Sequence, residues 1–144
     1  MIPPLVNGLL PPGVHEATWA EVETMFGTNP RRRALLQGLL AALQNLRAAG
    51  CGRAYLDGSF VTEKEIPGDF DGCWDGEGVD PDLLDPVLLD FHAPRLRQKA
   101  KYGGELFLNV REGSTGKPFV EFFQIDKESG APKGIIALDL GGLP

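Results

Sequence analysis

Two aspartates separated by a single phenylalanine, Asp69 and Asp71, have the spacing in this sequence best suited to chemistry. Alternate residues of a β-strand point to the same side, so both carboxylates would leave one face while Phe70 enters the core. Two negative charges placed so close repel each other unless a cation lies between them. Because the donors are all oxygen, the pattern favours Mg²⁺, Mn²⁺ or Ca²⁺ over zinc.

Gly58 and Ser59 precede these aspartates and follow a short apolar run. A Gly-Ser turn that leads from a strand into a helix can offer backbone N–H groups and a hydroxyl to an anion. The two motifs together therefore predict a site that holds phosphate next to a metal ion.

The order of Gly58 and Ser59 followed by Asp69-x-Asp71 resembles the nucleotidyltransferase superfamily, which includes DNA polymerase β, the aminoglycoside nucleotidyltransferases and the minimal MNT-type proteins. The residues on either side of both motifs resemble a small bacterial nucleotidyltransferase-like family. This resemblance implies that the two aspartates are catalytic and hold two Mg²⁺ (or Mn²⁺) ions. It also implies that Gly58 and Ser59 bind the triphosphate of an NTP.

The superfamily has a third acidic residue on a strand beside the Asp-x-Asp strand, and Glu121 is the residue that matches it, as a catalytic metal ligand. Glu121 lies among apolar residues in the segment 119–125, which is predicted to be a strand. A lone carboxylate buried in such a strand is costly unless it is paired or bound to metal. Glu105 and Asp139 also lie in predicted strands and are competing assignments.

A basic segment over 94–102 is predicted to be helical, with Lys99 and Arg95 four residues apart on one face. In an enzyme that transfers nucleotides, Lys99 would neutralise the triphosphate. In an ordinary surface helix it would face solvent. The sequence leaves both interpretations open.

Composition limits the class of protein. A chain of 144 residues with 42% hydrophobic content is expected to form a single domain over 1–144 with a real core. The formal charge of −6 argues against a broad basic surface for nucleic acid. Two cysteines and few histidines predict neither a disulfide framework nor a zinc site. We expect a cytoplasmic protein without membrane association, since no leader-like or bilayer-spanning run occurs.

The most secure predicted element is a helix over 30–49, in which Asn29 is the N-cap and leucines recur at helical spacing. The three arginines at 31–33 crowd its first turn and are interpreted as a solvated face. Residues 1–17 are rich in proline and are predicted to form an extended N-terminal arm.

Apolar runs predict five strands, at 53–56, 69–74, 105–110, 119–125 and 135–140. The last three are expected to be joined as antiparallel hairpins. The predicted fold is α+β (α/β) and nucleotidyltransferase-like: a mixed, largely antiparallel sheet of about five strands with the long helix packed on one face.

The resemblance implies transfer of a nucleotidyl group from an NTP to a hydroxyl on a protein, an RNA or a small molecule. Minimal members of the superfamily often belong to bacterial toxin–antitoxin pairs, so a partner protein is expected as well. The alternative is a non-catalytic nucleotidyltransferase-like antitoxin that neutralises its partner by binding. Gly72 supports this alternative because the superfamily usually has an apolar residue there, and so does the lack of the usual C-terminal helices. The acidic composition makes RNA a less suitable acceptor than protein.

Overall fold

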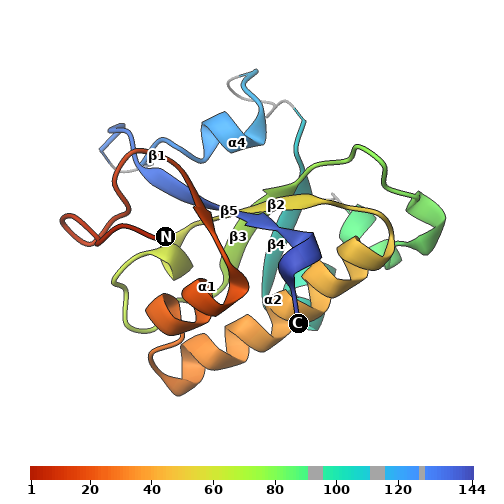
Figure 1. The fold of residues 1–144 in the computed structure, drawn as a ribbon, viewed down its shortest axis with the longest axis horizontal. Helices are drawn as coiled ribbons and strands as arrows, with labels where there is room; N and C mark the ends of the chain where they lie inside the picture. The colour runs from red at the N-terminus through yellow and green to blue at the C-terminus, as the bar shows by residue number, and fades with distance from the viewer. Residues whose placement is uncertain (91–95, 111–115, 127–128) are drawn as a thin grey trace.

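A mixed sheet of five strands forms the centre of the molecule in the computed structural model, which describes residues 1–90, 96–110, 116–126 and 129–144 (Figure 1). The strands are β1 (Gly13–Ala17), β2 (Arg53–Asp57), β3 (Phe70–Trp74), β4 (Gly104–Leu108) and β5 (Gly134–Asp139). Their order across the sheet is β1-β5-β2-β3-β4. The predicted α+β class is confirmed.

The strand pairings divide evenly between the two directions. β2 runs antiparallel to β3 and β5, whereas β1 is parallel to β5 and β3 is parallel to β4. A parallel pair needs a long crossover connection, and the chain between β3 and β4 supplies one that contains α3 (Leu96–Tyr102). The sheet is therefore mixed, as predicted, with a larger parallel share than expected.

Helices α1 (Trp19–Phe26) and α2 (Pro30–Ala48) cover one face of the sheet, below it in Figure 1. The Asn29 side chain accepts a hydrogen bond from the backbone N–H of Arg32, which caps α2 as the sequence predicts. Short 3₁₀ helices complete the chain: η1 (Ser59–Val61), η2 (Pro81–Leu83), η3 (Pro86–Leu89) and η4 (Leu140–Gly142). Within the described residues, no helix has the length and apolar character needed to cross a bilayer.

Alternation along the strands divides the core between the two faces. Leu56 and Phe70 pack with the leucines of α2 in the larger cluster. Tyr55 and Cys73, which point to the other side of the same strands, belong to a smaller cluster on the opposite face, together with Phe123. Both faces of β2 and β3 are consequently covered, so their side chains are held in place from both sides.

The predicted strand over 119–125 is wrong, because this segment contains the helix α4 (Phe119–Phe122). Three phenylalanines at 119, 122 and 123 have helical spacing, and their rings pack on one another and on Phe107 of β4. This short helix lies over the face that α1 and α2 leave open (Figure 1). The expected C-terminal hairpins are also wrong, since β4 and β5 are not neighbours in the sheet.

The N-terminal segment 1–17 is not an arm along its whole length. Its last five residues form β1, which pairs with β5 at the edge of the sheet. The prolines that predict an arm all precede β1. The pairing of β1 depends on β5, which is far away in the sequence.

Candidate active site

The turn after β2 brings the two predicted motifs together. β2 ends at Asp57, and Gly58 then adopts a positive φ of 81°, a conformation that residues with a Cβ rarely take. η1 begins at Ser59. A Cβ built on Gly58 would lie 2.5 Å from Oδ2 of Asp71. Glycine at this turn therefore permits both the left-handed backbone and the close approach of the Asp71 carboxylate.

Three carboxylates lie side by side across β2, β3 and β4. Asp71 is the register partner of Asp57 in β2 and of Glu105 in β4. Register partners in adjacent strands project from the same face of a sheet, and like charges there repel one another. The face is the one that carries α4, since Tyr55 and Cys73 lie two residues from Asp57 and Asp71 in the same strands and pack on that side. We call Asp57, Asp71 and Glu105 the carboxylate row.

Two lysines neutralise the ends of the carboxylate row. Lys133 Nζ lies 3.1 Å from Oδ1 of Asp57, and both side chains are largely buried, with exposed fractions of 14% and 7%. At the other end, Lys99 Nζ lies 3.0 Å from Oε1 of Glu105 and 3.5 Å from Oδ2 of Asp69. The hydrogen bond and charge of Glu105, followed by the charge of Asp69, raise the pKa of Lys99 above its usual value even though burial lowers it.

A cleft of about 660 Å³ opens beside this row, at the end of the sheet where β3 and β4 begin. Its polar lining combines one hydroxyl, one carboxylate and three cations. The lining residues are Arg31, Ser59, Lys64, Gly68, Asp69, Lys99, Ala100 and Gly103. Lys99 connects the two features, because it lines the cleft and also contacts Glu105 of the row.

Arg32 holds the loop that carries Ser59. Its side chain is buried, with an exposed fraction of 3%, and burial lowers the pKa of its guanidinium. The guanidinium donates hydrogen bonds to the backbone carbonyls of Phe60 at 2.6 Å, Thr62 at 2.8 Å and Lys64 at 3.2 Å. A buried charge is tolerated when it is fully hydrogen-bonded. The interpretation of this arginine as part of a solvated face is therefore wrong.

Arg31 and Asn29 also hold this loop, through hydrogen bonds to residues further along it. Arg31 donates to the backbone carbonyls of Pro67 and Gly68, and Asn29 donates to that of Glu65. The start of α2 is thus attached to most of the connection between the Gly-Ser turn and Asp69. One signal in the sequence pointed here: cations are unfavourable at a helix N-terminus unless other acceptors are present.

The structure brings five of the six predicted site residues to one end of the sheet, namely Gly58, Ser59, Asp69, Asp71 and Lys99. Glu121 is not among them. It is exposed on α4 and does not lie on a strand beside β3. Glu105, a competing assignment, occupies the neighbouring strand opposite Asp71.

Asp139, the other competing assignment, is exposed at the end of β5, where it accepts a hydrogen bond from the backbone N–H of Gly141. It serves as a cap for η4. Arg95, which was expected to share a face with Lys99, lies outside the described residues.

The donors around Lys99 are all carboxylate oxygens, which suits Mg²⁺ or Mn²⁺. A cation fits between Asp69 and Glu105, because the Lys99 ammonium already contacts both. Across the part of the chain that the structure describes, no three His, Cys, Asp or Glu side chains are arranged as they stand to hold a metal ion. A metal ion here would have to take the space of that ammonium.

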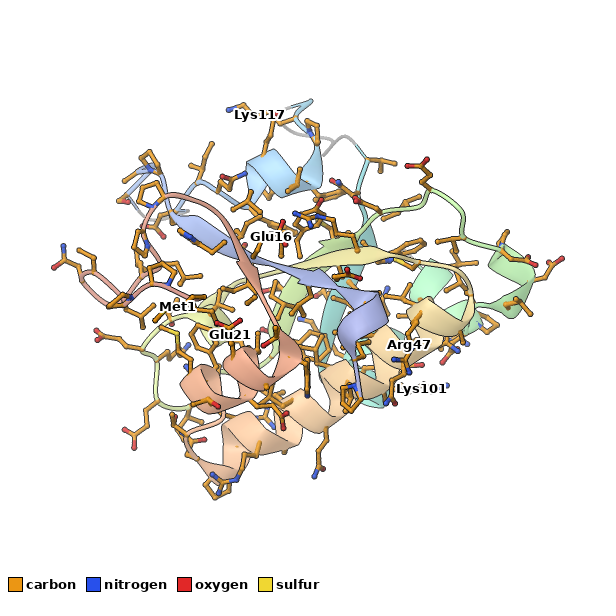
Figure 2. All side chains as sticks on the ribbon, viewed as in Figure 1. Met1, Glu16, Glu21, Arg47, Lys101 and Lys117 are labelled. Carbon is orange, nitrogen blue, oxygen red and sulfur yellow. The ribbon has the colours of Figure 1, made fainter. Side chains whose placement is uncertain are left out.

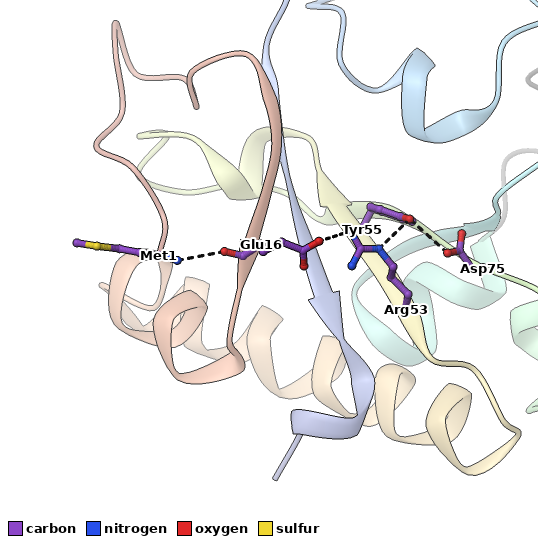
Figure 3. Close-up of polar contacts among 5 residues, drawn as sticks. All are labelled: Met1, Glu16, Arg53, Tyr55 and Asp75. Atoms are coloured by element: carbon purple, nitrogen blue, oxygen red, sulfur yellow. Dashed lines mark hydrogen bonds and ion pairs between the residues drawn. The ribbon is translucent and has the colours of Figure 1, made fainter.

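A second polar array occupies the same face at the opposite end of these strands (Figure 3). Arg53 forms an ion pair with Glu16 and donates to the Tyr55 hydroxyl at 3.0 Å. Tyr55 donates to Asp75 at 3.2 Å, and Asn109 donates to the other Asp75 oxygen at 3.0 Å. We call these residues the arginine chain. No local motif in the sequence marks Asp75, because its partners, Tyr55 and Asn109, come from separate parts of the chain.

The N-terminal amino group extends the arginine chain toward the edge of the sheet. It donates to the backbone carbonyl of Glu16 at 3.3 Å and pairs with the Glu21 carboxylate at 3.4 Å. Figure 2 shows Met1, Glu16 and Glu21 gathered there, away from Lys101 on the helix side and Lys117 beside α4.

The searches of curated proteins and of solved structures each gave no match. One family, described as a family of unknown function (DUF6932), matches residues 4–139. The match includes the Gly-Ser turn, β3, β4 and α3, and hence both the carboxylate row and the cleft. The chain belongs to the DUF6932 family of unknown function.

Proposed function

We propose that this protein is a Mg²⁺- or Mn²⁺-dependent nucleotidyltransferase that moves a nucleotidyl group from an NTP to an acceptor hydroxyl. The observation that carries the proposal is the cleft that gathers Ser59, Asp69 and Lys99 next to the carboxylate row. Ser59 lies at the turn after β2, Asp69 just before β3 and Lys99 in α3. The site therefore offers a cation that can bind phosphate and carboxylates that can bind a metal ion.

The cationic lining of the cleft suits a triphosphate. Arg31, Lys64 and Lys99 line the cleft together with Ser59, and charge-assisted hydrogen bonds to phosphate are stronger than neutral ones. The hydrogen bonds of Arg32 keep the Ser59 loop in one conformation, so the phosphate would bind without first ordering the loop.

Asp69, Asp71 and Glu105 are the residues that would hold the metal. In this assignment Glu105 replaces Glu121, because it stands opposite Asp71 on the adjacent strand. When bound, Mg²⁺ or Mn²⁺ would lower the pKa of an attacking hydroxyl and stabilise the charge of a leaving pyrophosphate. Asp57, next to Asp71 in the row, is paired with Lys133.

The acceptor is a hydroxyl on a protein, an RNA or a small molecule. A partner protein, such as the other member of a toxin–antitoxin pair, suits the net charge of −6 better than RNA does, since RNA binding relies on positive surface. We place this activity in the bacterial cytoplasm, where NTPs are available.

A non-catalytic antitoxin that binds its partner is the second candidate. One observation favours it: Asp57, Asp69 and Glu105 already contact lysines, Lys133 for the first and Lys99 for the other two, so much of their charge is neutralised without a metal. In that case the row would stabilise the sheet and would not take part in a reaction.

Radiolabelled nucleotides test the proposal. The protein would be incubated with Mg²⁺, a bacterial lysate and each of the NTPs in turn, labelled either at the α- or at the γ-phosphate. Nucleotidyl transfer labels an acceptor from the α-label only, and Asp71→Asn should abolish that label. If the wild type transfers no α-label from any NTP, the non-catalytic candidate is favoured.

A further inference from the structure

We infer that Lys99 is a built-in counter-cation of the site, which a divalent metal displaces and which then moves to the phosphate. This inference rests on the proposed function and assigns to it a mode of regulation. It predicts that metal and triphosphate bind cooperatively, because one lysine must leave the carboxylates before it can serve the phosphate.

The Lys99 ammonium lies where a metal ion would bind. Lys99 Nζ contacts one oxygen of Asp69 and one of Glu105 at 3.5 and 3.0 Å. A metal ion held by the same two carboxylates would lie in the same space. Two cations that close repel each other, by about 1 kcal/mol in water and more at a protein surface. Metal binding therefore requires Lys99 to leave.

Lys99 is able to leave its carboxylates, whereas Lys133 is not. The Lys99 side chain is 40% exposed, on a flexible stem that can reorient at low cost. Lys133 and its partner Asp57 are both largely buried, so separating them would strand a charge in the interior. Of the two lysines on the row, only Lys99 is suited to move.

The cleft is where a released Lys99 ammonium would move. Lys99 lines the cleft together with Arg31 and Lys64, so an ammonium released from Glu105 remains among the groups that would bind phosphate. Coupling between two ligands is reciprocal. A metal ion should therefore strengthen triphosphate binding, and triphosphate should strengthen metal binding to the same degree.

The test compares Lys99→Met with Lys64→Met, a matched control that removes the same charge from the same cleft. Among the described residues, no carboxylate lies within ion-pair distance of Lys64. Calorimetry with Mn²⁺ alone should give a dissociation constant on the order of tenfold lower for Lys99→Met than for the wild type. Lys64→Met should change it by less than about threefold. With saturating Mn²⁺, inorganic tripolyphosphate should bind more weakly to Lys99→Met.

Tighter Mn²⁺ binding together with weaker tripolyphosphate binding by Lys99→Met would identify displacement of Lys99 by the metal ion. If the wild type binds Mn²⁺ through Asp71, as judged by Asp71→Asn, but Lys99→Met binds it no more tightly, the inference fails while the proposed function stands. If Lys64→Met binds Mn²⁺ as much more tightly as Lys99→Met does, the inference also fails. The gain would then come from the lower positive charge of the cleft as a whole and not from displacement of one lysine. If neither the wild type nor Lys99→Met binds Mn²⁺, the proposed function itself fails.

Discussion

The carboxylate row and the arginine chain are two polar arrays on the same three strands, the same face of the sheet and opposite ends. β2, β3 and β4 supply Asp57, Asp71 and Glu105 to the row. The segments at the other end of these strands supply Arg53, Asp75 and Asn109 to the chain. Both arrays are half-buried and both contain acidic residues.

They differ in how their charges are balanced. In the arginine chain each polar side chain meets a partner of complementary character, through Arg53, the Tyr55 hydroxyl and Asp75. In the row, three carboxylates are neighbours, and the two lysines that contact Asp57 and Glu105 come from outside the strands. Neighbouring carboxylates beside a cleft, rather than a high density of polar residues, mark the end of the sheet suited to a ligand.

Matched substitutions in β3 and just after it should separate the two arrays most strongly. Asp71→Asn should reduce nucleotidyl transfer on the order of a thousandfold, because it removes a proposed metal ligand. Its free energy of unfolding should stay unchanged or rise, because a like charge leaves the row. Asp75→Asn should do the reverse: it should leave transfer intact and cost about 1.5–3 kcal/mol, since Tyr55 and Asn109 lose a charged acceptor.

Urea unfolding and transfer assays on both variants provide the comparison. Loss of stability in Asp71→Asn of the size expected for Asp75→Asn would mean that the row is a structural array like the arginine chain.

Two neighbouring arginines test how the cleft is held. Arg32→Met should lower the free energy of unfolding by about 2–4 kcal/mol, because the carbonyls of Phe60, Thr62 and Lys64 lose their donor. Among the residues that the structure describes, the one polar contact of the Arg33 side chain is a long one to the Gly27 carbonyl at 3.4 Å, so Arg33→Met should stay within about 0.5 kcal/mol of the wild type. Chemical denaturation of both variants measures the difference. Equal losses of stability in the two variants would show that Arg32 does not hold the loop.

Glycine substitutions on either side of β2 give a smaller effect. Gly58→Ala should cost about 1–3 kcal/mol, because it places a Cβ at positive φ and against the Asp71 carboxylate. Gly52, before the same strand, has nothing within 4 Å of a built Cβ and serves as the control. Thermal melts should show a lower Tm for Gly58→Ala alone. A Gly58→Ala protein as stable as the wild type would contradict the close approach of Asp71.

The smallest predicted effect is a pH dependence at Lys99. The hydrogen bond and charge of Glu105, with those of Asp69, raise the pKa of Lys99 in the folded protein. The ion pairs of Lys99 therefore stabilise the fold fully below the pKa of lysine in the unfolded chain, about 10.4. This stabilisation is lost as pH rises through the higher pKa of Lys99 in the folded protein. Because Lys99 is partly exposed, the wild type should exceed Lys99→Met by only about 0.5 kcal/mol at pH 8. This margin should disappear in strongly alkaline solution, and a constant margin would contradict the ion pairs.

Much of this end of the sheet could be predicted because its signals are local. Strand alternation sets the faces of Asp69, Phe70 and Asp71, and the Gly-Ser pair marks the turn. The long helix was also predictable, since its N-cap and leucine spacing lie within one segment.

The third carboxylate could not be assigned from the sequence for a non-local reason. Which acidic residue stands opposite Asp71 depends on which strand lies beside β3, and the crossover through α3 makes that strand β4. Glu121 lay in a segment where phenylalanines fit both a strand and a helix, and packing on Phe107 decided for the helix. The role of Arg32 was hidden because its partners are backbone carbonyls, which any sequence provides.

The place of β5 in the sheet has a consequence for how the protein is made. β5 is the last strand along the chain, yet it lies between β1 and β2 and is the only described strand that joins them. During translation, β2 therefore keeps an unpaired edge, and β1 has no partner, until β5 leaves the ribosome. Such long-range pairing makes folding slow and exposes edges that can aggregate. The sheet, and with it the proposed site, should be completed only after β5 has been synthesised.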